Sequence, residues 1–275
     1  MAQIPPCYLI NLDRCADRLA QMDARLRELG MAYQRVAGVD GLRLSDAEFA
    51  QHTRRNAFYK ALSRGEVGCY LSHVEVLRRF LADGGDCALV LEDDAILPDE
   101  LPALLRAAVA RRSGERDPDA RWDVLKLVRS RRRYVDFGPV TASRNLVEYA
   151  LSVPAVTTAA LWTREAALIW VQAYDGARRP IDCDLQHPWE YGLRIRSLHP
   201  PPVDAGVVSA MGGAVRKSRS PWPKLRYEAR RLGPKLRHFV AAYGWAGLLR
   251  LMFSRVLHRC PRRSAGTARP VPGRG

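Results

Sequence analysis

The stretch CALVLEDD, residues 87–94, runs from apolar residues directly into three consecutive carboxylates. A continuous apolar run of this length is typical of a central strand in a parallel sheet, which is covered on both faces. Glu92, Asp93 and Asp94 then fall at the carboxyl end of that strand, where their mutual repulsion is unfavourable unless something offsets it. Open α/β sheets bind ligands at this edge, because the loops there border an open crevice. The stretch therefore predicts an α/β fold with a ligand site at the strand end.

Strands and helices alternate on both sides of this stretch. Further strands are predicted at 7–11, 123–128 and 155–162, and residues 33–41 are predicted as a strand that runs into a glycine-rich turn. Helices are predicted at 17–30, 66–81, 99–112 and 164–174. Residues 129–145 are predicted to form a loop or a hairpin. The alternation is typical of an open, Rossmann-like α/β sheet with helices on both faces.

The formal net charge of +15 is concentrated at the end of the chain. Residues 1–215 contain 28 basic and 28 acidic residues, whereas residues 216–275 contain 16 basic residues and the single acid Glu228. We therefore divide the chain into a neutral globular domain, residues 1–215, and a basic C-terminal tail, residues 216–275.

The tail mixes basic residues with aromatic and aliphatic ones. Its longest uncharged apolar run, residues 239–249, is shorter than the roughly 20 residues that a spanning helix needs. An amphipathic segment with basic residues around an apolar patch is typical of peripheral association with an anionic membrane surface. A solvated, partly disordered tail and an RNA-binding arm are the alternatives.

The six cysteines show no zinc-like spacing. They are typical of reduced thiols in a cytosolic protein. The N-terminal residues lack the pattern of a secretory signal, so we expect a cytoplasmic protein.

Clustered carboxylates at a strand end commonly hold Mg²⁺ or Mn²⁺, which is shared with the phosphates of a substrate. Glu92 and Asp94 point to the same side of an extended strand, so this pair can share one ion. The alternative is a solvated acidic turn that begins the next helix at Asp99.

Five motifs, in their order and spacing, resemble those of glycosyltransferase family 25. They are INLDRCADR (10–18), VAGVDG (36–41), GEVGCYLSH (65–73), LVLEDDAIL (89–97) and RPIDCDLQ (179–186). The family contains lipooligosaccharide and lipopolysaccharide biosynthesis transferases and is related to the procollagen galactosyltransferases. The resemblance extends from residue 7 to about residue 204. It implies a GT-A-like fold and, usually, inverting transfer of galactose from UDP-galactose.

This resemblance implies that residues 1–215 form a catalytic domain that transfers a sugar to a lipooligosaccharide or lipopolysaccharide acceptor. The tail would then keep the enzyme at the cytoplasmic face of the bacterial inner membrane. Two rival functions are a basic nucleic-acid-binding protein and a catalytically inactive relative that binds sugar nucleotides or glycans. The neutral domain argues against the first, so no nucleic-acid partner is expected, and the intact EDD motif argues against the second.

The resemblance also implies roles for individual residues. Asp94 and Glu92 would ligate Mn²⁺ or Mg²⁺, and Glu92 or Asp93 would reach the ribose of the nucleotide. Further residues implied to bind the nucleotide sugar are Asn11, Asp13, Arg18, Gly65 and His73. The alternatives are a surface helix for Arg18, a buried core position for His73 and a helix-opening turn for Gly65.

An inverting transfer needs a base that removes the proton from the acceptor hydroxyl. Asp182 and Asp184 are the candidates, because both point the same way in an extended segment. Asp182 is alternatively a helix cap. The sequence departs from the family pattern at 157–167, where we expect Trp162 to alter the acceptor pocket.

Overall fold

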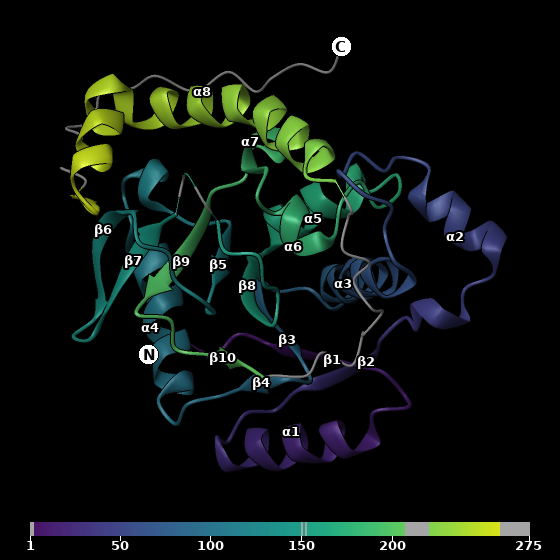
Figure 1. The fold of residues 1–275 in the computed structure, drawn as a ribbon. Helices are drawn as coiled ribbons and strands as arrows, with labels where there is room; N and C mark the ends of the chain where they lie inside the picture. The colour runs from purple at the N-terminus through teal and green to yellow at the C-terminus, as the bar shows by residue number, and fades with distance from the viewer. Residues whose placement is uncertain (1–2, 150, 152, 207–219, 259–275) are drawn as a thin grey trace.

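The computed structural model describes residues 3–149, 151, 153–206 and 220–258, which form a nine-stranded sheet flanked by helices (Figure 1). The strand order is β11-β6-β7-β9-β5-β8-β3-β1-β2. The strands are β1 (Cys7–Asn11), β2 (Gln34–Ala37), β3 (Cys87–Glu92), β5 (Val124–Lys126), β6 (Tyr134–Thr141), β7 (Arg144–Glu148), β8 (Ala159–Thr163), β9 (Ile195–His199) and β11 (Val256–His258). A separate antiparallel pair is formed by β4 (Ala95–Ile96) and β10 (Asp204–Ala205).

The α-helices are α1 (Ala16–Glu28), α2 (Asp46–Thr53), α3 (Arg64–Asp83), α4 (Leu101–Gly114), α5 (Arg164–Ala173), α6 (Ile181–Asp184), α7 (Pro188–Tyr191) and α8 (Trp222–Phe253). Two short 3₁₀ helices are η1 (Gly41–Arg43) and η2 (Pro118–Ala120).

The apolar run of β3 is buried on both faces of the sheet. Ala88 and Val90 pack in the core under α3 and α5, whereas Leu89 and Leu91 pack in a second core under α1 and α4. All four side chains are fully buried. This double burial explains why β3 lacks the apolar–polar alternation of a half-exposed strand. The predicted open α/β sheet with helices on both faces is confirmed.

The connections change face next to β1. The strand β1, at the predicted residues 7–11, pairs in parallel with both β2 and β3. Its following helix α1 covers one face, whereas α3, which leads from β2 into β3, covers the other. Two connections that leave on opposite faces open a crevice between the carboxyl ends of β1 and β3.

One strand runs against the expected direction. The segment predicted as a strand at 155–162 forms β8, which is antiparallel to both β3 and β5. In the chain, β8 follows the hairpin of β6 and β7 and does not follow a crossover helix. This hairpin is one of the two alternatives predicted for residues 129–145. A parallel strand requires a long crossover, so this hairpin route gives a mixed sheet.

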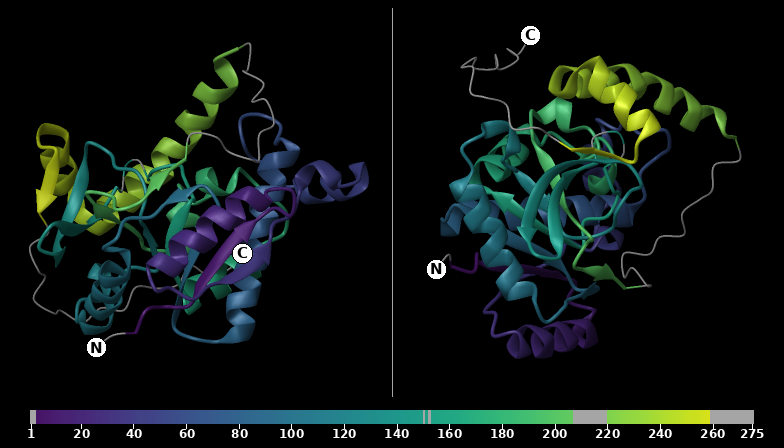
Figure 2. Two further views of the ribbon diagram at one scale, coloured as in Figure 1. Left: turned by 90° about the horizontal axis from the view of Figure 1, so that it is seen from below. Right: turned by 90° about the vertical axis from the view of Figure 1, so that its left-hand side faces the viewer.

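Part of the basic segment 216–275 packs against the sheet. Helix α8 turns sharply at Gly244 (φ 70°) and lies on the side of the molecule opposite α1 (Figures 1 and 2). Phe239 and Leu251 of α8 are buried together with Val135 of β6, and β11 then pairs with β6. No helix in the described ranges combines the length and the hydropathy that crossing a bilayer requires.

Gly68 brings α3 close to the loop that follows β2. A Cβ atom on Gly68 would lie 2.6 Å from the backbone nitrogen of Gly41 and 2.6 Å from the carbonyl oxygen of Val39. These atoms belong to backbone and cannot move aside as a flexible side chain would. The glycine therefore allows a close backbone contact within the chain.

We expect Gly68→Ala to lower the free energy of unfolding by about 1–3 kcal/mol, the usual cost of overpacking a core. Urea unfolding of the full chain measures this change. The matched control is Gly114→Ala in α4, where a Cβ meets nothing within 4 Å. Equal stability of the two variants would contradict the close contact.

Candidate active site at the carboxyl ends of β1 and β3

The ends of β1 and β3 are joined by a side-chain hydrogen bond. Asn11, the last residue of β1, is buried, and its Nδ2 donates to Asp93 Oδ2 at 2.7 Å. The same Nδ2 lies 3.0 Å from the carbonyl oxygen of Cys15. The predicted site residues Asn11 and Asp93 are therefore brought together, and Asn11 orients the carboxylate across the crevice.

Asp93 has a second partner in Arg18 of α1. Arg18 Nη1 lies 3.2 Å from Asp93 Oδ1, and both side chains are largely buried. Each oxygen of Asp93 thus has a donor, which offsets the repulsion from the neighbouring acids. Arg18 is held beside the acidic cluster and is not a fully exposed helix residue.

Glu92 is held by two donors at one oxygen. His73 Nε2 of α3 lies 3.0 Å from Glu92 Oε1, and Thr157 Oγ1 donates to the same oxygen at 2.6 Å. Burial opposes ionisation of Glu92, but the hydrogen bonds from His73 and Thr157 outweigh it and hold its pKa below the usual value. His73 is itself buried, as the alternative of a core position predicted, and it contacts Glu92; its role in binding a nucleotide sugar stays a prediction.

Asp94 differs from its two neighbours. Its Oδ1 is buried and has no hydrogen-bond partner among the described residues. Burial, together with the charges of Glu92 and Asp93, raises the pKa of Asp94 from 3.8 to about 6. The side chain borders a cavity of about 440 Å³ that Arg18 also lines.

An unpartnered carboxylate oxygen near two other acids is the arrangement that a bound cation would complete. Oxygen donors suit Mg²⁺ or Mn²⁺. Asp94 is the open ligand of the cluster, whereas Glu92 and Asp93 already have partners at one and both oxygens, respectively. The residues present therefore fit the metal expected from the sequence.

Asp13 lies further toward solvent than the other predicted nucleotide-binding residues. Arg35 of β2 contacts its carboxylate and also donates from Nε to Asn11 Oδ1 at 3.1 Å. Asp13 and Asp40 line a smaller cavity of about 260 Å³ next to the crevice. Arg35 thus links the end of β1 to this outer part of the site.

Gly65 lies in the first turn of α3, where it is buried. Ser63 caps this helix and forms a capping box with Glu66. The helix-opening turn, the alternative reading of Gly65, is therefore present at this position.

A second potential metal arrangement involves Cys69, one helical turn before His73. Ligand atoms of Cys69, His73 and Glu92 lie within 4.8 Å of one another. Burial, and next the charge of Glu92, raise the pKa of the Cys69 thiol well above its usual value. Sulfur is a soft donor that Mg²⁺ and Mn²⁺ disfavour, so this trio fits a hard cation less well than Asp94 does.

The two candidate bases have different environments. Asp184 is fully buried and accepts hydrogen bonds from Tyr70 at 2.9 Å and Tyr191 at 2.8 Å, and Arg179 Nη1 lies 2.6 Å from its Oδ1. Asp182 is partly buried and accepts a bond of 2.7 Å from the backbone nitrogen of Cys183. The extended segment assumed for the pair is instead the short helix α6, which turns the two side chains apart.

Lys126 is a site residue that the sequence patterns did not single out. It is buried at the end of β5, and its Nζ donates to the carbonyl oxygen of Pro154. Burial lowers the pKa of Lys126 to about 8, although the charges of Asp182 and Glu92 act in the opposite direction. Lys126 therefore lies close enough to Asp182 and Glu92 for their charges to act on it. The sequence feature that could have revealed Lys126 is its position as the single charged residue in the apolar run 124–128.

Trp162 does not border these cavities. It is buried in the core, where its ring packs edge-on against Trp170 with centroids 5.5 Å apart. The side chain points into the core under α5, so Trp162 lines neither cavity directly, and an effect on the acceptor pocket stays a prediction.

An open α/β sheet with polar side chains gathered at a switch in the connections defines a ligand-binding α/β protein. Residues 4–126 match the family model of glycosyltransferase family 25 (LPS biosynthesis protein). These residues are therefore similar to glycosyltransferase family 25, which agrees with the resemblance found in the motifs.

Individual proteins of this family are also similar to the chain in sequence. A glycosyltransferase 25 family member of Anopheles gambiae is 31% identical over 157 residues, covering 53% of this chain and 25% of the relative. Procollagen galactosyltransferase 2 of Homo sapiens is 33% identical over 94 residues, covering 32% of this chain and 15% of the relative. Inactive glycosyltransferase 25 family member 3 of Homo sapiens is 28% identical over 129 residues, covering 44% and 21%. The chain thus spans a quarter or less of the length of these relatives.

Among solved structures, a glycosyltransferase involved in the glycosylation of the major capsid of PBCV-1 aligns with 82% of this chain and 98% of its own. The TM-score is 0.37 and the sequence identity is 10%.

Removing the charge of Asp94 should stabilise the metal-free protein. The pKa of Asp94 is about 6 in the folded chain against an ordinary 3.8, so the stability linked to its protonation is lost as the pH rises through this interval. We expect Asp94→Asn to gain about 1–2 kcal/mol at pH 7.5 in EDTA, after allowance for partial exposure to solvent, and nothing near pH 3.5. Urea unfolding at both pH values measures the difference.

The control is Asp204→Asn, which removes an exposed carboxylate from the neighbouring strand β10. It should leave stability unchanged at both pH values. An Asp94→Asn protein that is less stable than wild type at pH 7.5 would show that Asp94 is paired.

Proposed function

We propose that this protein is an inverting glycosyltransferase that moves a hexose, galactose in the first instance, from a UDP-sugar to a saccharide acceptor. The observation that carries the proposal is the unpartnered carboxylate of Asp94 beside Glu92 and Asp93 at the crevice between β1 and β3. The name of the relative procollagen galactosyltransferase 2 supports galactose as the first donor to test. The description of the matched family as an LPS biosynthesis protein supports a lipooligosaccharide or lipopolysaccharide acceptor.

The acidic cluster would serve the donor. Asp94, with an oxygen of Glu92 or Asp93, would hold Mn²⁺ or Mg²⁺, which when bound neutralises charge on the diphosphate of the departing UDP. Asn11 and Arg18 keep Asp93 in place, and His73 and Thr157 do the same for Glu92. These contacts fix the carboxylates before the donor arrives, which lowers the reorganisation that binding requires.

The base would be Asp182 on the acceptor side. Asp184 is already committed to two tyrosines and Arg179, and Glu190 accepts from Arg179 at 2.8 and 3.0 Å. Asp182 has no such ion pair among the described residues. It is therefore the carboxylate of this segment that is available to take the proton of the acceptor hydroxyl.

A donor screen tests the function. The full chain is incubated with a panel of UDP-hexoses and extracted lipooligosaccharide, and released UDP is measured with Mn²⁺, with Mg²⁺ and with excess EDTA. We expect acceptor-dependent release from one UDP-hexose that EDTA abolishes. UDP binding without any turnover across the panel would instead indicate an inactive sugar-nucleotide-binding relative.

In the same assay, Asp182→Asn should slow transfer by about 100-fold or more, the usual scale for removing a general base, and should retain UDP binding in Mn²⁺. Asp184→Asn should instead lower the melting temperature, because it weakens a buried network of hydrogen bonds. Wild-type turnover in Asp182→Asn would exclude this residue as the base.

We further propose that α8 holds the enzyme peripherally on an anionic membrane, at the cytoplasmic face of the inner membrane where such an acceptor would be made. Trp245 and Phe253 are 69% and 90% exposed, whereas Leu248 and Leu251 of the same helical turns are buried. Arg250 and Arg255 lie beside the exposed apolar residues in the chain. Basic and aromatic side chains on one exposed face favour binding at a bilayer interface.

Vesicle sedimentation tests this association with the full chain. We expect pelleting with phosphatidylglycerol vesicles, weak pelleting with phosphatidylcholine vesicles, and a decrease of about tenfold or more in Trp245→Ser/Phe253→Ser. The matched control, Leu42→Ser/Ile96→Ser, removes two residues of similar exposure (60% and 58%) that lie away from α8. Equal loss in both double variants, or none in either, would contradict a role for the α8 face.

A further inference from the structure

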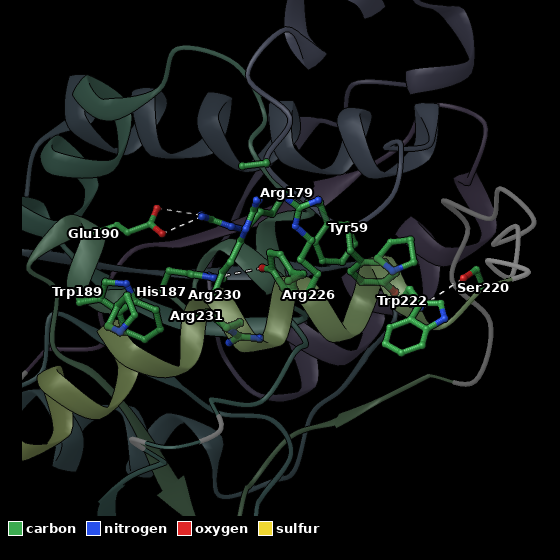
Figure 3. A pocket seen from close by; sticks show the side chains of 15 residues that line it. Tyr59, Arg179, His187, Trp189, Glu190, Ser220, Trp222, Arg226, Arg230 and Arg231 are labelled. Atoms are coloured by element: carbon green, nitrogen blue, oxygen red, sulfur yellow. Dashed lines mark hydrogen bonds and ion pairs between the residues drawn. The ribbon is translucent and has the colours of Figure 1, made fainter.

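A cavity of about 750 Å³ lies between the first half of α8, the loop at residues 57–59 and the segment at 179–190 (Figure 3). It is separate from the cavity beside Asp94, since the two share no lining residue. The donor chemistry proposed above does not use it. Its walls combine arginines with aromatic rings.

Two arginines of the cavity lack a counter-ion. Arg226 and Arg230 are one helical turn apart on α8, and neither has a hydrogen bond or ion pair within the described parts of the chain. Among the described residues that line the cavity, Glu190 is the single acidic one, and Arg179 donates hydrogen bonds to both of its carboxylate oxygens. The cavity therefore has an excess of positive charge that is available to a ligand.

The aromatic side chains provide flat apolar surfaces next to these charges. Phe58, Tyr59 and Tyr227 pack together, with ring centroids 4.3 to 5.9 Å apart. Trp222 also lines the cavity and is 72% exposed. The C–H face of a sugar ring is apolar and slightly positive, so it packs well on the electron-rich face of an aromatic ring.

The cavity is built on the segment that carries the candidate base. Arg179 and His187 line it, and Asp182 lies between them in the chain. Tyr227 of α8 is 3.2 Å from His187 Nε2, and Arg231 donates to Gln186 at 3.2 Å. These contacts fasten α8 to residues 179–190, so a ligand in the cavity would adjoin the acceptor side of the site.

We propose that this cavity binds the acceptor as an anionic saccharide, one that bears a phosphate or carboxylate group. The exposed aromatic faces would hold the sugar ring, and Arg226 and Arg230 would bind the anion. The assignment to the acceptor rests on the proposed transferase function. Arginine is suited to this role because its planar guanidinium donates two parallel hydrogen bonds to phosphate or carboxylate.

Ligand-observed NMR titrations of the full chain test the proposal. The probes are glucose 6-phosphate, glucose and glycerol 3-phosphate, and EDTA is present to exclude binding through a metal at Asp94. We expect glucose 6-phosphate to bind at least about tenfold more tightly than either other probe, because only it offers both a sugar ring and an anion. Equal binding of glycerol 3-phosphate would indicate a site for a lipid headgroup or free phosphate and would overturn the saccharide assignment.

Matched charge variants place the binding in the cavity. Arg226→Gln/Arg230→Gln should weaken glucose 6-phosphate binding by about tenfold or more. The control Arg237→Gln/Arg250→Gln removes the same charge from exposed positions of α8 outside the cavity lining and should bind as wild type. Equal weakening in both double variants would overturn the proposal, because it would reflect net charge alone.

Binding of UDP in Mn²⁺, measured on the same proteins, separates this inference from the proposed function. Normal UDP binding without specific binding of glucose 6-phosphate would overturn the cavity assignment alone. Specific binding of glucose 6-phosphate in a protein that neither binds UDP nor releases it from any UDP-hexose would overturn the transferase function and leave the anionic-saccharide site supported.

Discussion

The repulsion among three adjacent carboxylates is the constraint on which the site depends. Glu92 is stabilised by donors from α3 and from Thr157, two residues before β8, and Asp93 by donors from β1 and α1. Asp94 has no equivalent partner at its buried oxygen within the described structure. The fold therefore offsets two of the three charges and leaves the third for a ligand, which is a common way to prepare a cation site.

A second buried network holds the segment around Asp182. Arg179 joins Asp184 and Glu190, and Asp184 also accepts from Tyr70 of α3 and from Tyr191. Since α3 also carries His73, one helix supports both the acidic cluster and the segment around Asp182. Helix α3 thus sets the spacing between the acidic cluster and this segment.

Helix α8 has two structural surfaces. Its buried residues, such as Phe239, close the core against β6, so the helix is part of the folded body. Its exposed residues differ along its length: Arg226 and Arg230 border the aromatic cavity before the bend at Gly244, whereas Trp245 lies beyond it. Within the described part of this segment, basic residues thus border the cavity before the bend, and exposed apolar residues lie beyond it.

The sequence by itself determined the α/β class, the strand at 7–11 and the position of EDD at a strand end, because burial of a central strand requires a local, continuous apolar run. Local patterns did not distinguish Asp182 from Asp184, or reveal Lys126 as a buried cation of the site. Those properties depend on contacts between residues far apart in the chain, such as Tyr70 with Asp184, 114 positions away. Only the tertiary structure decided which carboxylates are already paired, since pairing and desolvation in the packed core set the charge that remains for a ligand.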